Sequence, residues 1–217
     1  MDVPFLSTVV WKVNPNQPDE SMIASAASVV LGGGVIVYPT ETLYGLGGHP
    51  MLKATIDRIY SIKGRLLDKP LPLIATDMKS ILAWMDEWPH MAQQLAEVFW
   101  PGPLTLVLPA RRILASRLHE SRGKIAIRIS SHPVCKALSA AAGGLLVSTS
   151  ANFSDQPASN DPLQISPELM SKVDGILDAG TLSGKLPSTI VDVSTFPPQL
   201  LRRGCIPWER ITNVLGL

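Results

Sequence analysis

Lys63, Arg65 and Lys69 place three cations within seven residues near the end of a predicted helix. The C-terminal end of a helix favours positive charge, so an ordinary capping role would account for one of them. Three cations exceed what a cap requires, and Gly64 lets the backbone come close to a ligand. Because arginine grips pairs of oxygens and lysine acts as a point charge, the cluster indicates a polyphosphate site.

Two further polar clusters each follow an apolar segment directly. The segment 148–152 (Ser-Thr-Ser-Ala-Asn) offers three hydroxyls and an amide, and the segment 39–45 (Pro-Thr-Glu-Thr-Leu-Tyr-Gly) offers two hydroxyls, a carboxylate and a phenol. Such groups bind phosphate, a metal ion or a carboxylate, although an ordinary capped turn has the same composition. Since ligands of open α/β sheets bind at strand ends, both segments are candidate ligand-binding loops.

Arginine and serine side chains also mark the ends of other predicted strands. Arg128 ends the apolar run 125–127, so we expect its guanidinium at the ligand-binding edge of the sheet. It suits a carboxylate, which either a ligand or one of the chain's own acids could supply. Ser188 precedes the run 190–192, and Arg202 ends the last predicted strand. Together these residues predict a site with several cations and many hydroxyls, without a histidine base or a cysteine nucleophile. Such a site suits nucleotidyl transfer, where catalysis depends on positioning and charge stabilisation.

Familiar nucleotide and hydrolase motifs are missing from the sequence. The segment 180–185 is one residue short of a P-loop and lacks its final hydroxyl, and 45–48 lacks the spacing of a dinucleotide fingerprint. No serine-hydrolase or zinc-peptidase motif is present. The four histidines are dispersed along the chain, so no residue is predicted to ligate a metal directly.

The elements that must position these residues alternate between strands and helices. Hydrophobic periodicity predicts helices at 21–31, 52–62, 78–85, 91–99, 132–142 and from 207, and strands at 35–38, 71–75, 104–108, 124–129, 145–147, 189–193 and 199–202. The segment 152–167 is rich in Ser, Asn, Asp and Pro and predicts a long loop. This order predicts an α/β fold with an open sheet, and without a convincing linker we expect one domain over 1–217.

Composition indicates a globular protein without a general affinity for polyanions. Hydrophobic residues make up 46% and charged residues 17% of the 217 residues, and the formal net charge is +1. Cys135 and Cys205 are isolated, as expected of ordinary thiols in a reducing cytoplasm. The first residues lack a signal-peptide pattern, and apolar runs such as 104–110 are only of strand length. We therefore expect a cytoplasmic location and no membrane contact.

Seven motifs in one order resemble the YrdC/TsaC family of threonylcarbamoyl-AMP synthases over about residues 33–204. They are Gly-Val-Ile-Val-Tyr-Pro-Thr-Glu-Thr-Leu-Tyr-Gly-Leu-Gly (34–47), Lys-Gly-Arg (63–65), Trp-Pro-Gly-Pro-Leu-Thr-Leu-Val-Leu (100–108), Ile-Ala-Ile-Arg (125–128), Ser-Thr-Ser-Ala-Asn-Phe-Ser (148–154), Ser-Thr-Ile-Val-Asp (188–192) and Leu-Arg-Arg-Gly (201–204). The resemblance implies a YrdC-like single domain, with a twisted open mixed β-sheet flanked by helices. The short chain is similar to the bacterial single-domain form.

The resemblance implies a reaction in which L-threonine, bicarbonate and ATP give threonylcarbamoyl-AMP and pyrophosphate. Downstream tRNA threonylcarbamoyl transferase proteins would then move the threonylcarbamoyl group to the adenosine beside the anticodon. ATP is thereby expected as a substrate, with Mg²⁺ carried by its phosphates.

The resemblance also implies roles for individual residues. Those for ATP and Mg²⁺ are Lys63, Arg65, Lys69, Ser150, Asn152 and Arg202, with Lys63 and Arg65 as the catalytic pair. Those for threonine are Thr42, Arg128, Ser148 and Ser188.

Three positions depart from the family pattern. The family usually has proline where this chain has Leu66, often has proline where it has Ser130, and usually has glycine where it has Asp155. These changes bear on the shapes of the loops rather than on the polar groups of the site. The chain keeps the Lys-x-Arg and Ser-Ala-Asn signatures, which a sister branch without a clear activity lacks.

Two other functions remain open at this point. A double-stranded RNA-binding or ribosome-assembly role would use the basic stretch formed by Arg111, Arg112, Arg117, Arg122 and Lys124, although a solvated loop has the same composition. A carbamoyl-transfer module like that of hydrogenase maturation is the third possibility. Pyrophosphate release from ATP in the presence of threonine and bicarbonate would distinguish the three.

Overall fold

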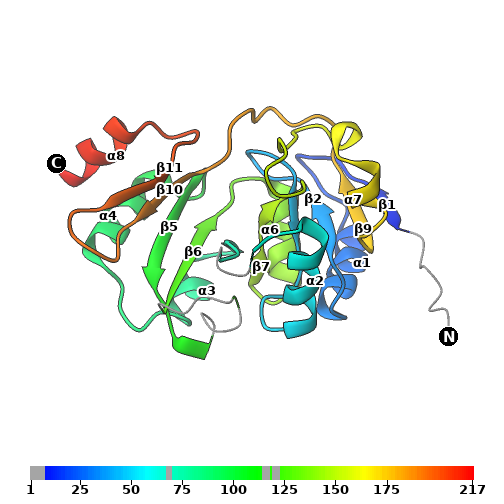
Figure 1. The fold of residues 1–217 in the computed structure, drawn as a ribbon, viewed down its shortest axis with the longest axis horizontal. Helices are drawn as coiled ribbons and strands as arrows, with labels where there is room; N and C mark the ends of the chain where they lie inside the picture. Colours follow the sequence, from blue (N-terminus) through cyan, green and yellow to red (C-terminus); the bar gives the residue numbers. More distant parts are fainter. Residues whose placement is uncertain (1–7, 67–69, 114–117, 119–122) are drawn as a thin grey trace.

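The computed structural model describes residues 8–66, 70–113, 118 and 123–217, and its strands form two sheets (Figure 1). The five-stranded sheet has the order β1 (Val9–Lys12), β9 (Gly175–Asp178), β2 (Ile36–Tyr38), β3 (Gly45–Gly47) and β8 (Thr149–Ser150). The six-stranded sheet has the order β11 (Gln199–Arg202), β10 (Thr189–Asp192), β5 (Leu104–Pro109), β6 (Lys124–Ile129), β4 (Leu73–Ala75) and β7 (Leu145–Val147). The helices are α1 (Glu20–Leu31), α2 (Lys53–Lys63), α3 (Met78–Leu82), α4 (His90–Phe99), α6 (Pro133–Ala141), α7 (Pro167–Met170) and α8 (Trp208–Leu215), with the 3₁₀ helix η1 (Pro162–Gln164).

The α/β class and the mixed strand directions predicted from the sequence are confirmed. Every predicted helix and strand is present, with ends that move by up to three residues. The strands divide between two sheets where one was expected, and β1, β3, β8 and β9 were not predicted. The strands β3, with the sequence Gly-Leu-Gly, and β8, with only two residues, are too short to show a period.

Ser148 links the two sheets. The strand β7 ends at Val147 in the six-stranded sheet, and β8 begins at Thr149 in the five-stranded sheet, so the chain changes sheets at this one residue. The sheets approach closely here, because a Cβ atom added to Gly47 would lie only 1.8 Å from the Val147 carbonyl oxygen. Tyr38 also donates from its hydroxyl to that oxygen at 2.7 Å. The hydroxyl cluster of 148–152 is therefore fixed at the junction of the sheets.

Helices cover only part of the six-stranded sheet on the side that faces α1 and α6. Ile74 of β4 and Leu146 of β7 pack with these helices in one buried cluster. Arg128 lies directly beside Ile74 in the β4–β6 pairing, on the same face of the sheet. The helical cover thus ends near β6, and the face of the sheet beyond it borders the site described below.

No helix in the described ranges combines the length and the apolar character needed to cross a membrane.

Candidate functional site

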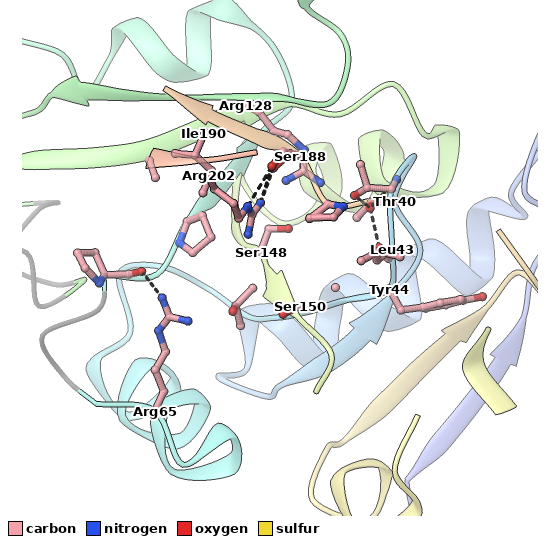
Figure 2. Close-up of a pocket in the computed structure, with 17 residues that line it drawn as sticks. Thr40, Leu43, Tyr44, Arg65, Arg128, Ser148, Ser150, Ser188, Ile190 and Arg202 are labelled. Carbon is pink, nitrogen blue, oxygen red and sulfur yellow. Dashed lines mark hydrogen bonds between the residues drawn. The ribbon is translucent and has the colours of Figure 1, made fainter. Parts of the chain in front are cut away.

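A cavity of about 140 Å³ lies between the two sheets and collects most of the polar residues singled out above (Figure 2). The five-stranded sheet contributes the turn from Thr40 to Gly45 that joins β2 and β3. The six-stranded sheet contributes residues of β6, β10 and β11, and Arg65 approaches from beyond the end of α2. The predicted site residues that border the cavity are Thr42, Arg65, Arg128, Ser148, Ser150, Ser188 and Arg202.

Three other predicted residues are placed differently. Lys63 and Asn152 do not border the cavity in the part of the chain that the structure describes, but both contact Ser150, which does. Lys69 lies outside the described residues. Seven of the ten predicted residues therefore border one cavity, and Lys63 and Asn152 lie next to it in contact with Ser150.

The alternation of β6 explains how Arg128 reaches the cavity. Ile125, Ile127 and Ile129 point into the main core, so Ala126 and Arg128 point to the opposite face, where both line the cavity. The sequence had suggested that Arg128 emerges at the edge of the sheet beyond a buried run. It projects instead from the face of the sheet, because the apolar run is only half buried and Ala126 belongs to the open side.

Arg128 is paired with a carboxylate of the chain itself. Its Nε donates to Oε1 of Glu41 at 3.0 Å, and the two side chains are only 6% and 12% exposed. The buried Ser130 hydroxyl donates to the other carboxylate oxygen of Glu41 and accepts a hydrogen bond from the His132 backbone N–H. The terminal nitrogens of Arg128 make no further hydrogen bond within the described residues, so they remain for a ligand in the cavity.

Glu41 and Ser130 are residues that the sequence analysis did not assign. Glu41 was visible in the polar segment 39–45, but nothing in the sequence pairs it with a residue 87 positions away. Ser130, which departs from the family pattern, completes the contact.

Arg202 and Ser188 form a second fixed unit. Arg202 donates from Nε and Nη2 to the Ser188 carbonyl oxygen at 3.0 and 2.8 Å, and from Nη2 to the Ser188 hydroxyl at 2.8 Å. That hydroxyl also bonds to the hydroxyl of Thr105 at 2.8 Å. Desolvation of the guanidinium, followed by the charges of Arg128 and Arg65, lowers the pKa of Arg202 to about 10. Arg202 therefore stays charged at neutral pH, and the three guanidiniums that border the cavity favour an anionic ligand.

Lys63 holds the turn from Ser150 to Asn152 in place through hydrogen bonds. It is 2% exposed, and its Nζ donates to the Ser150 carbonyl at 2.6 Å and to the Asn152 carbonyl and Oδ1 at 2.7 and 3.1 Å. Burial, followed by the nearby charge of Arg65, lowers the pKa of Lys63 to about 7. Its three ammonium hydrogens thus face three acceptors of one turn, and the cavity meets Ser150 rather than Lys63.

Gly64 has its structural reason in the backbone. It caps α2 with φ of +59°, a left-handed conformation that favours glycine, and no atom would obstruct an added Cβ. The turn between Lys63 and Arg65 therefore favours glycine for its backbone conformation, and close approach of a ligand at Gly64 stays a prediction.

Thr40 and Thr42 form a directional pair in the turn before β3. Thr40 donates from its hydroxyl to the Leu43 carbonyl at 2.6 Å, so the 2.9 Å bond between the two hydroxyls takes its hydrogen from Thr42. Thr42 consequently presents acceptor lone pairs to the cavity. Tyr44 is directed away from Arg128 and Arg202 in Figure 2, and its hydroxyl bonds to Gly180 and Ala179, so the phenol expected in this cluster does not join it.

The cavity is built for an anionic ligand rich in oxygen atoms. Three guanidiniums from separate segments surround hydroxyls of Thr42, Ser148, Ser150 and Ser188. Within the described residues no group of three His, Cys, Asp or Glu side chains could hold a metal ion. Oδ1 of Asn152, the best oxygen ligand at the Ser150 turn, already accepts hydrogens from Ser150 and Lys63. A magnesium ion would fit here only with most of its ligands supplied by a bound phosphate chain.

The basic stretch predicted for RNA contact is partly neutralised. Arg111 lies 3.8 Å from a carboxylate oxygen of Asp86, and Lys124 lies 3.1 Å from one of Asp192. Arg117 and Arg122 lie outside the described residues.

This chain is similar in sequence to a known protein family and to several named proteins. The Sua5/YciO/YrdC family model, described as "Telomere recombination", matches residues 28–204. A Nitrosococcus oceani protein named threonylcarbamoyl-AMP synthase is 39% identical over 170 residues, which cover 78% of this chain and 92% of the relative. A Pyrococcus abyssi protein of the same name is 32% identical over 198 residues, or 91% of this chain, and the chain spans 58% of that relative's length.

A solved structure shares the fold closely. The crystal structure of Pyrococcus abyssi Sua5 complexed with L-threonine superposes with a TM-score of 0.91 at 32% identity, covering 96% of this chain and 61% of that one.

Proposed function

This chain belongs to the Sua5/YciO/YrdC family, and we propose that it is a threonylcarbamoyl-AMP synthase. It would join L-threonine, bicarbonate and ATP, and release threonylcarbamoyl-AMP, pyrophosphate and water. The observation that carries this proposal is the cavity, which is bordered by Arg65, Arg128 and Arg202 and by the hydroxyl-bearing side chains of Thr42, Ser148, Ser150 and Ser188. The likeness to a threonine-bound structure supports the choice of amino acid.

In this proposal Arg128 holds the carboxylate of threonine through its terminal nitrogens. A planar guanidinium binds a carboxylate with two parallel hydrogen bonds, and the Glu41 contact leaves its outer end for the ligand. The hydroxyls of Thr42, Ser148 and Ser188 lie around the same space and would bind the amine and hydroxyl groups of threonine.

ATP would lie toward Arg65, Arg202 and Ser150, with Mg²⁺ bound to its phosphates. Lys63 and Asn152 would act on ATP chiefly by holding the Ser150 turn, because their polar atoms bond to that turn. A direct phosphate contact from Lys63 would require those bonds to open. Lys69 would extend the cationic side beyond Arg65.

The chemistry needs little beyond positioning and charge stabilisation. The amine of threonine forms a bond to the carbon of bicarbonate with loss of water. A carboxylate oxygen of the resulting carbamate then bonds to the α-phosphorus, and the bond from that phosphorus to pyrophosphate breaks. The guanidiniums of Arg65 and Arg202 would stabilise the negative charge that develops on the leaving pyrophosphate.

We propose that residues 1–217 act as one domain in the cytoplasm, and that the product passes to tRNA threonylcarbamoyl transferase proteins. The RNA-binding alternative is not favoured, because the described cations of the basic stretch include two that face carboxylates.

The test is pyrophosphate release by the purified chain with ATP, Mg²⁺, L-threonine and bicarbonate. Release should fall to background when threonine or bicarbonate is omitted. Release from ATP alone at the same rate would contradict the proposal.

A further inference from the structure

Glu41 places a negative charge beside a cavity whose other charged groups are positive. Its carboxylate bonds to Nε of Arg128 at 3.0 Å and to the Ser130 hydroxyl, and its side chain is 12% exposed. Glu41 and Ser130 do not border the cavity within the described residues, so they act on a ligand through Arg128. Nothing in the proposed chemistry requires this carboxylate, and a site for anions alone would be better without it.

The pairing divides the cavity into two ends of different charge. At one end the charge of Arg128 is offset by Glu41. The other end runs from Arg202 toward Arg65, with Arg202 between Arg128 and Arg65 in Figure 2. The carbonyl and hydroxyl of Ser188 that hold Arg202 are neutral groups, so these contacts do not offset its charge. A ligand that is neutral overall fits the first end, and a polyanion fits the second.

The hydroxyl of Thr42 points to the same conclusion independently. Its hydrogen is directed to Thr40, whose own hydrogen is directed to the Leu43 carbonyl, so Thr42 offers only acceptor lone pairs to the cavity. A phosphate or carboxylate oxygen would be repelled there, whereas an ammonium or hydroxyl group would donate a hydrogen bond. The Arg128 end thus combines a donor for a carboxylate with an acceptor for an amine.

We infer that Glu41 is a specificity-determining positioning residue, which makes the Arg128 end select a zwitterionic amino acid and reject phosphate. This inference rests on the proposed function and adds how the amino acid and ATP are kept in their own halves of one cavity. Glu41 does so by balancing the charge of Arg128 and fixing its orientation. Ser130 fixes Glu41 in turn, through the second carboxylate oxygen.

Glu41→Gln tests the inference because it keeps the size of the side chain and removes its charge. Calorimetric titration should show L-threonine binding weakened about tenfold or more, since Arg128 loses its charged anchor. Inorganic phosphate should bind several-fold more tightly and should become a competitor of threonine, because the Arg128 end is now positive. If the role of Glu41 were only structural, Glu41→Gln would weaken the binding of both ligands.

Asp192→Asn is the matched control. Asp192 of β10 pairs with Lys124 of β6 at 3.1 Å, and its side chain is 12% exposed, as that of Glu41 is, but neither Asp192 nor Lys124 borders the cavity. This variant should bind both ligands as the unmodified chain does. Opposite shifts for threonine and phosphate in Asp192→Asn would overturn the inference, since any lost carboxylate would then have the same effect.

Ser130→Ala provides a second variant that leaves every charge in place. Ser130→Ala should weaken L-threonine binding several-fold and leave phosphate binding unchanged. Unchanged threonine affinity, or phosphate affinity in Glu41→Gln that is equal or lower, would overturn the inference. If the unmodified chain binds no L-threonine, the proposed function fails, while the phosphate comparison still decides whether Glu41 excludes anions.

Discussion

Arg128 donates from Nε to the Glu41 carboxylate at 3.0 Å, and both side chains are almost completely buried beneath the cavity. The arginine proposed to hold the carboxylate of threonine is therefore itself held by a carboxylate of the chain. Guanidinium has five donors in a fixed plane, so it can satisfy Glu41 with one side and a ligand with its outer end. Lysine has no such geometry.

Arg128→Lys should weaken L-threonine binding by roughly tenfold to a hundredfold and change ATP binding little. The ammonium group would pair with Glu41 and lose the parallel bonds to the ligand. Calorimetric titration with each ligand separates the effects. A defect for ATP that equals or exceeds the defect for threonine would contradict the assignment.

Lys63→Ala and Arg65→Ala should differ in stability although both lose activity. Lys63 makes three hydrogen bonds to partly buried oxygens of Ser150 and Asn152, and the loss of these bonds should cost about 1–3 kcal/mol. Half-buried Arg65 should cost less than about 1 kcal/mol, while kcat/KM falls roughly tenfold to a hundredfold. Urea unfolding and pyrophosphate release measure the two quantities. Equal stability of the variants would show that Lys63 does not support the turn.

The Lys-x-Arg spacing correctly predicted two cations at the end of a helix. It could not show that Gly64, in a left-handed conformation, turns the two side chains to different surroundings. Arg65 reaches the cavity and Lys63 is buried behind it.

Lys63 should also make stability depend on pH. Burial lowers its pKa from 10.5 to about 7 in the folded protein, whereas the unfolded chain keeps the ordinary value. Between these values the unfolded state binds the extra proton, so the free energy of unfolding contributed by Lys63 rises as pH increases from about 7 to about 10. Lys63→Met removes this contribution and adds a pH-independent offset. Parallel pH dependences of the two proteins in urea unfolding would contradict the shift.

Replacing Asp155 with glycine should destabilise the protein less than replacing it with valine. Asp155 has a left-handed φ of +63°, and its side chain is exposed, so packing does not decide the outcome. Asp155→Val should lower the free energy of unfolding by about 1–2 kcal/mol, because a β-branched side chain is strained in this conformation. Asp155→Gly should stay within about 0.5 kcal/mol, since relief of strain offsets the entropy of glycine. Greater destabilisation by glycine in urea unfolding would contradict this account.

The Asp155 conformation also explains how the chain departs from its family pattern without losing the turn. The sequence predicted a changed loop shape where glycine is usual. Aspartate is among the few residues that enter this region at modest cost, so the backbone keeps a glycine-like path after Ser154.

The strand β6 and the helix α2 could be predicted from local patterns, because each shows a clear hydrophobic period in the sequence. The strands β3 and β8 could not, because segments of two or three residues gain strand form only from pairing with other strands. The same limit applies to the site. Arg128 was identified from its own type and position, whereas its partner Glu41 depends on how the two sheets pack.

The most direct test of the function is the identity of the product. The purified chain, given ATP, Mg²⁺, L-threonine and ¹³C-bicarbonate, should form a compound whose mass contains AMP, threonine and one labelled carbon, with one pyrophosphate released for each molecule. No labelled AMP adduct should form when L-threonine is left out. Pyrophosphate release without any labelled adduct of threonine and AMP would contradict the account.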